Sequence, residues 1–244
     1  MPEVEHINPY HDDSRSKGEQ VQQMFDNIAP AYDFMNRAMT FGLDRAWLKA
    51  LLREAAKGEP VDVLDLATGT GDVALALRRR LPGANICGMD LSEGMLEIAR
   101  RKNERANAGI TFIQGDCLAT GLPDSSADLI TIAYGVRNFQ DLQAGYREMA
   151  RVLRPGGKLC VLELAQPANP VLKAGYRAYT STLIPLAGRL MSKDSRAYSY
   201  LPESVAAVPQ RAAMTALMEQ AGLAEARFKA LIPGVCVLYT ATKL

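Results

Sequence analysis

The feature that most constrains this chain is a buried strand that runs into a glycine-containing turn and then directly into a helix. Residues 61–66 read Val-Asp-Val-Leu-Asp-Leu, which predicts a strand in the interior of a sheet. Residues 67–71 read Ala-Thr-Gly-Thr-Gly and form the turn. A helix is expected over 72–81, ended by Pro82-Gly83.

The rest of the chain repeats this alternation of strand and helix. Further strands are predicted at 85–89, 110–113, 127–133 and 158–164, with helices at 93–105, 140–153 and 209–221. Two last strands, 226–232 and 235–242, flank Pro233-Gly234 and predict an antiparallel hairpin. We therefore expect an α/β fold of the Rossmann-like kind, with a mostly parallel seven-stranded sheet that ends in this hairpin.

Three segments lie outside the alternation. Residues 1–16 are polar, and we expect a loose tail. The single domain is expected over 17–244, with a helical extension at 17–57 and an inserted helical cap at 168–208. The cap carries Tyr176, Tyr179, Leu183, Ile184, Leu186 and Leu190, interspersed with Lys173, Arg177 and Arg189. This mixture suits a cap that opens onto a membrane surface, and it suits ordinary cap packing equally.

The count of histidines and cysteines excludes several kinds of enzyme. The chain has 244 residues and two histidines, His6 and His11, both in the N-terminal tail. A Ser-His-Asp hydrolase, a histidine-ligated zinc enzyme and a histidine base in the core are therefore unexpected. The four cysteines are far apart and form no Cys-x-x-Cys pair, so we expect buried thiols and no bound metal.

Charge and hydropathy give further limits. The net charge is +1, which lacks the electrostatic signature of a nucleic-acid-binding protein. The run Arg100-Arg101-Lys102 is expected to form a solvated helix face. No segment is long and apolar enough to span a bilayer, and the N-terminus has no apolar region of a signal peptide. We expect a soluble cytoplasmic protein that can still touch a membrane from outside.

The glycine turn is typical of a nucleotide-binding loop. Gly69 and Gly71 let the backbone approach a ligand without a Cβ between them. The pattern Gly69-x-Gly71-x-x-Ala74 also fits the dinucleotide fingerprint, and Asp90 lies about 20 residues later, where a ribose-binding acid belongs. An NAD(P)-dependent oxidoreductase, a non-catalytic cofactor-binding module and a merely structural turn are therefore alternatives.

Three features favour S-adenosylmethionine over NAD(P). Asp65 lies in the strand just before the turn, where it can order the loop or meet a cationic amino-acid group. Asp116 and Cys117 follow the third strand, where they can contact an adenine edge. The reversed last strand is a feature of class I methyltransferases. The predicted cofactor-binding residues are Asp65, Gly69, Thr70, Gly71, Asp90, Asp116 and Cys117.

Longer segments resemble the quinone C-methyltransferases of menaquinone and ubiquinone biosynthesis. Residues 32–36, Tyr-Asp-Phe-Met-Asn, and 41–47, Phe-Gly-Leu-Asp-Arg-Ala-Trp, are similar to one signature of that family. Residues 151–159, Arg-Val-Leu-Arg-Pro-Gly-Gly-Lys-Leu, through Glu163 are similar to a second, and 134–138, Tyr-Gly-Val-Arg-Asn, to an internal element. The resemblance covers about residue 19 to the end.

The resemblance implies a reaction and shows departures. It implies transfer of a methyl group from S-adenosylmethionine to a ring carbon of demethylmenaquinol, a polyprenylated quinol drawn from the membrane surface. The close alternative is a polyprenyl methoxybenzoquinol of the ubiquinone branch. This sequence departs from the family pattern at Thr40, Asp44, Thr68, Ala133 and Ala165. The opening segment and Asp44 are most similar to menaquinone-branch members.

The predicted catalytic residues are Asp44, Arg137 and Asn138. Asp44 stands where the family usually has a histidine, so it is the candidate to assist deprotonation of the quinol. Arg137 and Asn138 follow the fourth strand, at the ligand edge of the sheet, and are candidates to hold the quinol oxygen. Alternatives for Asp44 and Arg137 are a helix N-cap beside Trp47 and an ion pair that holds the loop. Tyr32 either lines a lid or only packs.

Overall fold

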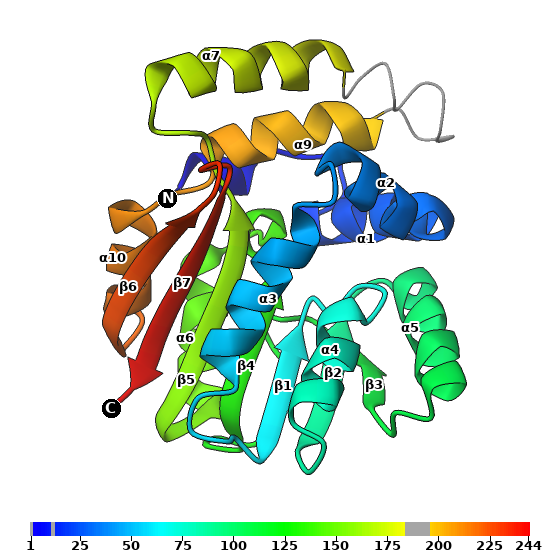
Figure 1. Ribbon diagram of the computed structural model, residues 1–244, viewed down its shortest axis with the longest axis vertical. Helices are drawn as coiled ribbons and strands as arrows, with labels where there is room; N and C mark the ends of the chain where they lie inside the picture. Colours follow the sequence, from blue (N-terminus) through cyan, green and yellow to red (C-terminus); the bar gives the residue numbers. More distant parts are fainter. Residues whose placement is uncertain (1, 11–12, 184–195) are drawn as a thin grey trace.

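The computed structural model describes residues 2–10, 13–183 and 196–244. Its centre is a seven-stranded sheet of order β3-β2-β1-β4-β5-β7-β6 (Figure 1). The strands are β1 (Asp62–Leu66), β2 (Asn85–Asp90), β3 (Thr111–Gln114), β4 (Ala127–Ala133), β5 (Leu153–Leu164), β6 (Leu223–Leu231) and β7 (Cys236–Lys243). The first five are parallel, whereas β7 runs antiparallel to both β5 and β6. The predicted fold class is confirmed.

Helices cover both faces of the sheet because successive strand residues point to opposite sides. Val63 and Leu129 share one core with α3 (Asp44–Ala55), α4 (Asp72–Arg80) and α5 (Glu93–Ala106). Leu64 and Ile130 share the other with α6 (Leu142–Val152) and α10 (Ala212–Gln220). A strand that is buried on both faces reads as a nearly continuous apolar run, as residues 61–66 do.

A third layer lies over the carboxyl ends of the parallel strands (Figure 1). The N-terminal segment contributes η1 (Glu3–His6), α1 (Lys17–Ile28), η2 (Ala29–Ala31) and α2 (Tyr32–Met39). The segment after β5 contributes α7 (Pro170–Ala178), the π-helical turn η4 (Tyr179–Leu183) and α9 (Arg196–Ala207). Met24, Met35 and Tyr200 form a shared core within this layer. Of the cap residues predicted to face a lipid, Ile184, Leu186, Arg189 and Leu190 lie outside the described residues.

Caps and a bulge explain small differences from the predicted boundaries. The Ser92 hydroxyl caps α5 by accepting a hydrogen bond from the N–H of Met95 at 3.2 Å. Asp141 caps α6 in the same way, so that helix begins at Leu142 rather than at residue 140. Strand β5 begins at Leu153 rather than at residue 158, because a register shift against β4 accommodates the intervening Pro-Gly-Gly.

The prediction of a loose N-terminal tail is wrong for residues 2–10. Val4 is completely buried in the core that α6 and α10 form with one face of the sheet. The Glu5 carboxylate accepts a hydrogen bond from the N–H of Leu142 at 2.9 Å, at the start of α6. The Lys17 ammonium donates to the carbonyl of Val4 at 2.5 Å. One apolar side chain and two polar anchors therefore fix a segment whose composition is polar.

Candidate active site

The turn after β1 has the backbone geometry that only some residues adopt easily. Gly69 and Gly71 have φ values of +56° and +80°. A Cβ on Gly71 would lie 3.0 Å from Ala99 Cβ and Phe112 Cζ, so Gly71 allows the helix α4 to pack closely. A Cβ on Gly69 would meet nothing within 4 Å, because Gly69 borders open cavity space. Gly71 therefore serves close packing, whereas Gly69 leaves the turn open to cavity space.

Asp65, in β1 just before the turn, orders the turn through hydrogen bonds. It lines neither of the two cavities that lie at this edge of the sheet. Its carboxylate is 1% exposed and accepts hydrogen bonds from the hydroxyls of Thr68 and Thr131, both at 2.6 Å. Burial raises the pKa of Asp65 to about 6, although the hydrogen bonds from Thr131 and Thr68 lower it. Of the two roles predicted for Asp65, the structure therefore provides the contacts for ordering the loop.

We expect Asp65→Asn to remove a pH dependence of stability. The folded chain binds this proton more tightly than the unfolded chain does, since the pKa rises from 3.8 to about 6 on folding. The protonated Asp65 carboxyl therefore contributes to the stability of the folded chain below pH 4, and this contribution is lost as the pH rises through about 6. At pH 7 the variant should be as stable as the wild type or more stable, by about 3 kcal/mol at most.

Urea unfolding between pH 4 and 7 measures this effect. Asp62→Asn, at the other end of β1, is the matched control because hydrogen bonds from Asn85 and Arg154 lower the pKa of Asp62. That carboxylate should instead stabilise the fold above its ordinary pKa and stop doing so as the pH falls. If Asp65→Asn unfolds with the same pH dependence as the wild type, the buried carboxyl does not titrate as described.

A small cavity of about 90 Å³ lies at the carboxyl ends of β1, β2 and β4, and Asp90 lines it. The Asp90 carboxylate accepts hydrogen bonds from the N–H of Gly69 at 2.8 Å and the N–H of Ser92 at 2.9 Å. Burial raises the pKa of Asp90, against the hydrogen bonds from these backbone groups. Asp90 therefore joins the glycine turn to the start of α5.

Asp116 and Cys117 line the same cavity, as the sequence predicted for an adenine site. Asp116 Oδ1 accepts a hydrogen bond from the N–H of Leu118 at 2.9 Å, and burial raises the pKa of the Cys117 thiol strongly. Helix α1 closes the opposite side of the cavity with Val21 and Phe25. That α1 covers this cavity could not be predicted from the sequence, because the periodicity of α1 only predicts a helix with one apolar face.

Thr70 connects the turn to α2 instead of facing the small cavity. Its hydroxyl donates to Asp33 Oδ1 at 2.6 Å and accepts from Lys102 Nζ at 3.0 Å. Lys102 also forms ion pairs with Asp33 at 2.6 Å and Asp72 at 2.7 Å. The prediction that Lys102 belongs to a merely solvated helix face is therefore wrong, since it bridges three separate elements.

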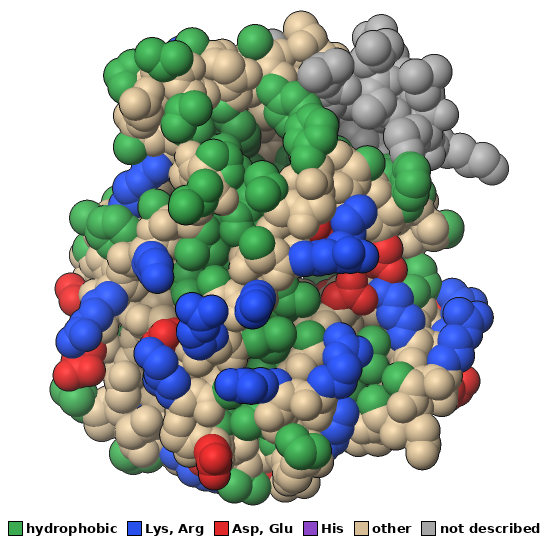
Figure 2. All heavy atoms as spheres, viewed as in Figure 1, with side chains coloured by type: hydrophobic (Ala, Val, Ile, Leu, Met, Phe, Trp, Pro, Cys, Tyr) green, Lys and Arg blue, Asp and Glu red, His purple; other side chains and the backbone are tan. Residues whose placement is uncertain are grey.

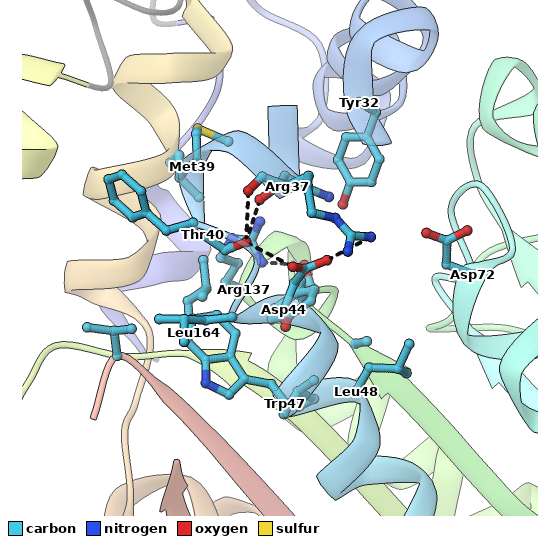
Figure 3. A pocket seen from close by; sticks show the side chains of 18 of the residues that line it. Tyr32, Arg37, Met39, Thr40, Asp44, Trp47, Leu48, Asp72, Arg137 and Leu164 are labelled. Atoms are coloured by element: carbon cyan, nitrogen blue, oxygen red, sulfur yellow. Dashed lines mark hydrogen bonds and ion pairs between the residues drawn. The ribbon is translucent and has the colours of Figure 1, made fainter. Parts of the chain in front are cut away.

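A large cavity of about 540 Å³ lies beside the small one (Figure 3). Helices α2, α3 and α7, the glycine turn and the end of β4 supply its walls. The residues that border both cavities are Tyr32, Ala67, Gly69, Ala133 and Tyr134. The two cavities therefore share a wall next to the turn, and a ligand in one approaches a ligand in the other there.

Asp44 lines the large cavity from the first turn of α3 (Figure 3). Its carboxylate accepts a hydrogen bond from the Thr40 hydroxyl at 3.1 Å and pairs with the Arg37 guanidinium at 3.2 Å. The N-cap position of α3 is Leu43, so the alternative that Asp44 is the N-cap is wrong. Trp47 packs nearby, and its indole N–H donates to the carbonyl of Ile232 at 2.9 Å.

Arg137 and Asn138, though adjacent in sequence, face different cavities. Arg137 lines the large cavity and pairs with the buried Glu163 at 2.9 Å, so the ion pair considered as an alternative for Arg137 is present. Burial is the largest single influence on the pKa of Arg137 and lowers it, but Glu163, Tyr32 and Tyr200 together raise it above its ordinary value, so the guanidinium stays charged. Asn138 lines the small cavity, where its Oδ1 accepts from the Tyr200 hydroxyl at 3.1 Å. The structure therefore does not bring Asn138 to Asp44 and Arg137.

In residues 2–10, 13–183 and 196–244, no three His, Cys, Asp or Glu side chains are grouped so that they could hold a metal ion. Within the same residues, no helix has the length and apolar character needed to cross a membrane.

The fold and the paired cavities define a class I methyltransferase. β7 runs antiparallel between β5 and β6, and the small cavity lies where the ends of β1 and β2 meet. An S-adenosylmethionine-dependent methyltransferase of Thermotoga maritima has this fold, with a TM-score of 0.61 at 19% identity, covering 91% of this chain and 99% of that one. Residues 13–243 match the ubiE/COQ5 methyltransferase family, and the chain belongs to this family.

Two relatives are similar to this chain over nearly its whole length. It is 42% identical over 241 residues to a demethylmenaquinone methyltransferase of Bacteroides fragilis, covering 98% of each chain. It is 43% identical over 223 residues to a ubiquinone/menaquinone biosynthesis C-methyltransferase of Syntrophotalea carbinolica, covering 91% of this chain and 94% of that one. The family resemblance predicted from the sequence is confirmed, and the oxidoreductase alternative is wrong.

Proposed function

We propose that this methyltransferase transfers the methyl group of S-adenosylmethionine to a ring carbon of demethylmenaquinol, giving menaquinol. The observation that carries the proposal is the pair of adjoining cavities, one with acids for a nucleoside and one apolar with a buried arginine. The relative from Bacteroides fragilis supports the menaquinone branch. The ubiquinone-branch quinol is the alternative, because the relative from Syntrophotalea carbinolica carries both names.

The small cavity suits the adenosine part of the cosubstrate. Asp90 would hold the ribose hydroxyls, Asp116 and Cys117 would border the adenine, and Asn138 would lie on the same side. Ligand sites usually enclose roughly 300 Å³ or more. The cosubstrate therefore needs the space beside Gly69, where the two cavities share a wall, or an outward movement of α1. Bound there, S-adenosylmethionine supplies an electrophilic methyl group.

The large cavity suits the quinol ring and its activation. Removal of a phenolic proton moves electron density onto the adjacent ring carbon, which attacks the methyl group. The methyl–sulfur bond breaks as the new carbon–carbon bond forms, S-adenosylhomocysteine leaves, and loss of the ring hydrogen as a proton restores aromaticity. In our proposal Asp44 assists the first step and Arg137 stabilises the phenolate in a site that excludes water. Tyr32 and Tyr134 border both cavities and hold the two substrates in line.

The mouth of the large cavity suits an isoprenoid tail. Phe41, Leu43, Val171 and Leu172 line the cavity and are also exposed to solvent. Figure 2 shows hydrophobic side chains gathered over the upper part of this face, with Lys and Arg side chains below them. An exposed apolar patch of this kind is typical of a lipid or protein contact. We propose that the protein is cytoplasmic and takes the quinol from a membrane surface through this mouth.

Complementation of a bacterial strain that lacks its own demethylmenaquinone methyltransferase tests the proposal. We expect extracts of the complemented strain to contain menaquinone in place of demethylmenaquinone, as measured by mass spectrometry. A strain that lacks the ubiquinone-branch methyltransferase distinguishes the alternative substrate. Restoration of ubiquinone alone, or of neither quinone, would contradict the proposal.

We expect Asp44→Asn to lower kcat by about 10²-fold, with the largest loss at low pH, where the phenol ionises least. Asparagine keeps an acceptor for the Thr40 hydroxyl but cannot take a proton. The matched control is Glu54→Gln, which removes a carboxylate from an exposed ion pair with Lys57 at the other end of α3. The measurement is the rate of methyl transfer with saturating cosubstrate from pH 6 to 9. Equal kcat values for both variants would remove Asp44 from the mechanism.

A further inference from the structure

Glu163, at the end of β5, binds Arg137 at two points. Its carboxylate is 1% exposed and accepts hydrogen bonds from Arg137 Nη1 at 2.9 Å and from the backbone N–H of Arg137 at 3.2 Å. A third bond comes from the N–H of Leu164 at 2.8 Å. One carboxylate therefore fixes both the side chain and the main chain of an arginine on a different element.

The remaining contacts leave one donor of the guanidinium group without a partner among the described residues. Arg137 Nη1 also donates to the carbonyl of Tyr134, and the carbonyl of Arg137 accepts from Lys17 Nζ at 3.2 Å. The Arg137 Nε–H is buried and has no hydrogen-bond partner among the described residues. A buried donor that is left unpaired calls for an explanation, and Arg137 lines the large cavity (Figure 3).

Three donors converge on Glu163, which explains why a carboxylate is needed there. Both of its oxygens accept hydrogen bonds, so the amide of a glutamine would place a donor against one of the N–H groups. The negative charge also balances Arg137, and both side chains of this ion pair are buried. Neutral or shorter side chains would leave the guanidinium without a fixed orientation.

We propose that Glu163 is a positioning residue that orients the Arg137 guanidinium toward the quinol oxygen in the large cavity. This inference rests on the proposed function, in which Arg137 stabilises the phenolate. Glu163 does not touch the substrate, and it acts only through Arg137. Its effect should therefore disappear when Arg137 is absent.

A double-mutant cycle on kcat, with both substrates saturating, tests this dependence. Glu163→Gln alone should lower kcat at least about tenfold, but by less than the roughly 10²- to 10³-fold expected for loss of a stabilising donor. The same change in an Arg137→Ala background should lower kcat no further. The KM for the quinol and the affinity for S-adenosylhomocysteine should stay within about twofold of wild type.

The matched control is Glu148→Gln, because Glu148 also accepts several hydrogen bonds, from Arg151 and Thr120, but borders neither cavity. Its kcat should equal that of the wild type. If Glu163→Gln does not fold, Glu163→Asp serves instead. It keeps the charge on a side chain that is one methylene shorter, and it should lower kcat in the same way.

Three outcomes would overturn the inference. Wild-type kcat in Glu163→Gln, with a reduced kcat in Arg137→Ala, would overturn it and leave the proposed function intact. An equal loss in both backgrounds would show that Glu163 acts independently of Arg137. Wild-type kcat in Arg137→Ala would overturn it together with the role that the proposed function gives to Arg137.

Discussion

Replacement of Arg137 by alanine is expected to lower kcat by roughly two to three orders of magnitude, because one donor to a developing oxyanion in a dry site contributes about 3–4 kcal/mol. Cofactor affinity should barely change, since Arg137 lines the large cavity. The measurement is the rate of methyl transfer to a short-tailed demethylmenaquinol with saturating cosubstrate. A kcat near that of the wild type would place the stabilising group elsewhere, for example at Tyr134.

This variant also needs a control for folding. Alanine at position 137 leaves the Glu163 carboxylate buried without its partner, which typically costs about 3–5 kcal/mol. The double variant Arg137→Met/Glu163→Leu removes both charges and fills similar volume, so it should regain stability in urea unfolding. Its kcat should stay low. Recovery of activity together with stability would show that Arg137 has only a structural role.

Replacement of Asp90 by alanine is expected to weaken binding of S-adenosylhomocysteine by about 10- to 150-fold, which corresponds to about 1.5–3 kcal/mol. In the proposed function, the change removes the acceptor for the ribose hydroxyls. It also releases the N–H groups of Gly69 and Ser92, which position the glycine turn and the start of α5. Isothermal calorimetry measures the affinity directly.

Asp116→Ala provides a graded comparison. Asp116 borders the same cavity but holds only the N–H of Leu118 in its own turn, so its removal disturbs the glycine turn less. We expect a smaller loss of affinity than for Asp90→Ala. An Asp90→Ala protein that folds and binds with wild-type affinity would remove Asp90 from the cofactor site.

Local patterns predicted much of the fold because they are set by nearby residues. The apolar run before Gly69, the glycine turn and the Ser92 cap are each marked by a few neighbouring residues. The structure contains all three, as strand β1, a hydrogen bond from the N–H of Gly71 to the carbonyl of Thr68, and a hydrogen bond from the N–H of Met95 to Ser92. The packing of Val4 could not be predicted in this way. It depends on a core formed by residues at least 60 positions away, and a single apolar residue in a polar segment gives no periodic signal.

The site was predictable to the level of residues but not to the level of their directions. Asp90, Asp116 and Arg137 follow strands, and the carboxyl ends of parallel strands meet at one edge. Arg137 and Asn138 share a short 3₁₀ turn, η3 (Val136–Asn138), and both side chains donate to the carbonyl of Tyr134, so the sequence does not show which cavity each one reaches. Lys102 was missed because its partners come from two other elements.

The most direct test of the central claim uses S-adenosylmethionine with a deuterated methyl group and a short-tailed demethylmenaquinol under reducing, anaerobic conditions. If the proposed C-methylation of demethylmenaquinol is correct, the product carries three deuterium atoms in a new methyl group on a ring carbon, as located by mass spectrometry and NMR. We also expect Arg137→Ala, folded and loaded with cosubstrate, to form this product at least about a hundredfold more slowly. A label found on a quinol oxygen, or no transfer to the quinol at all, would contradict the account.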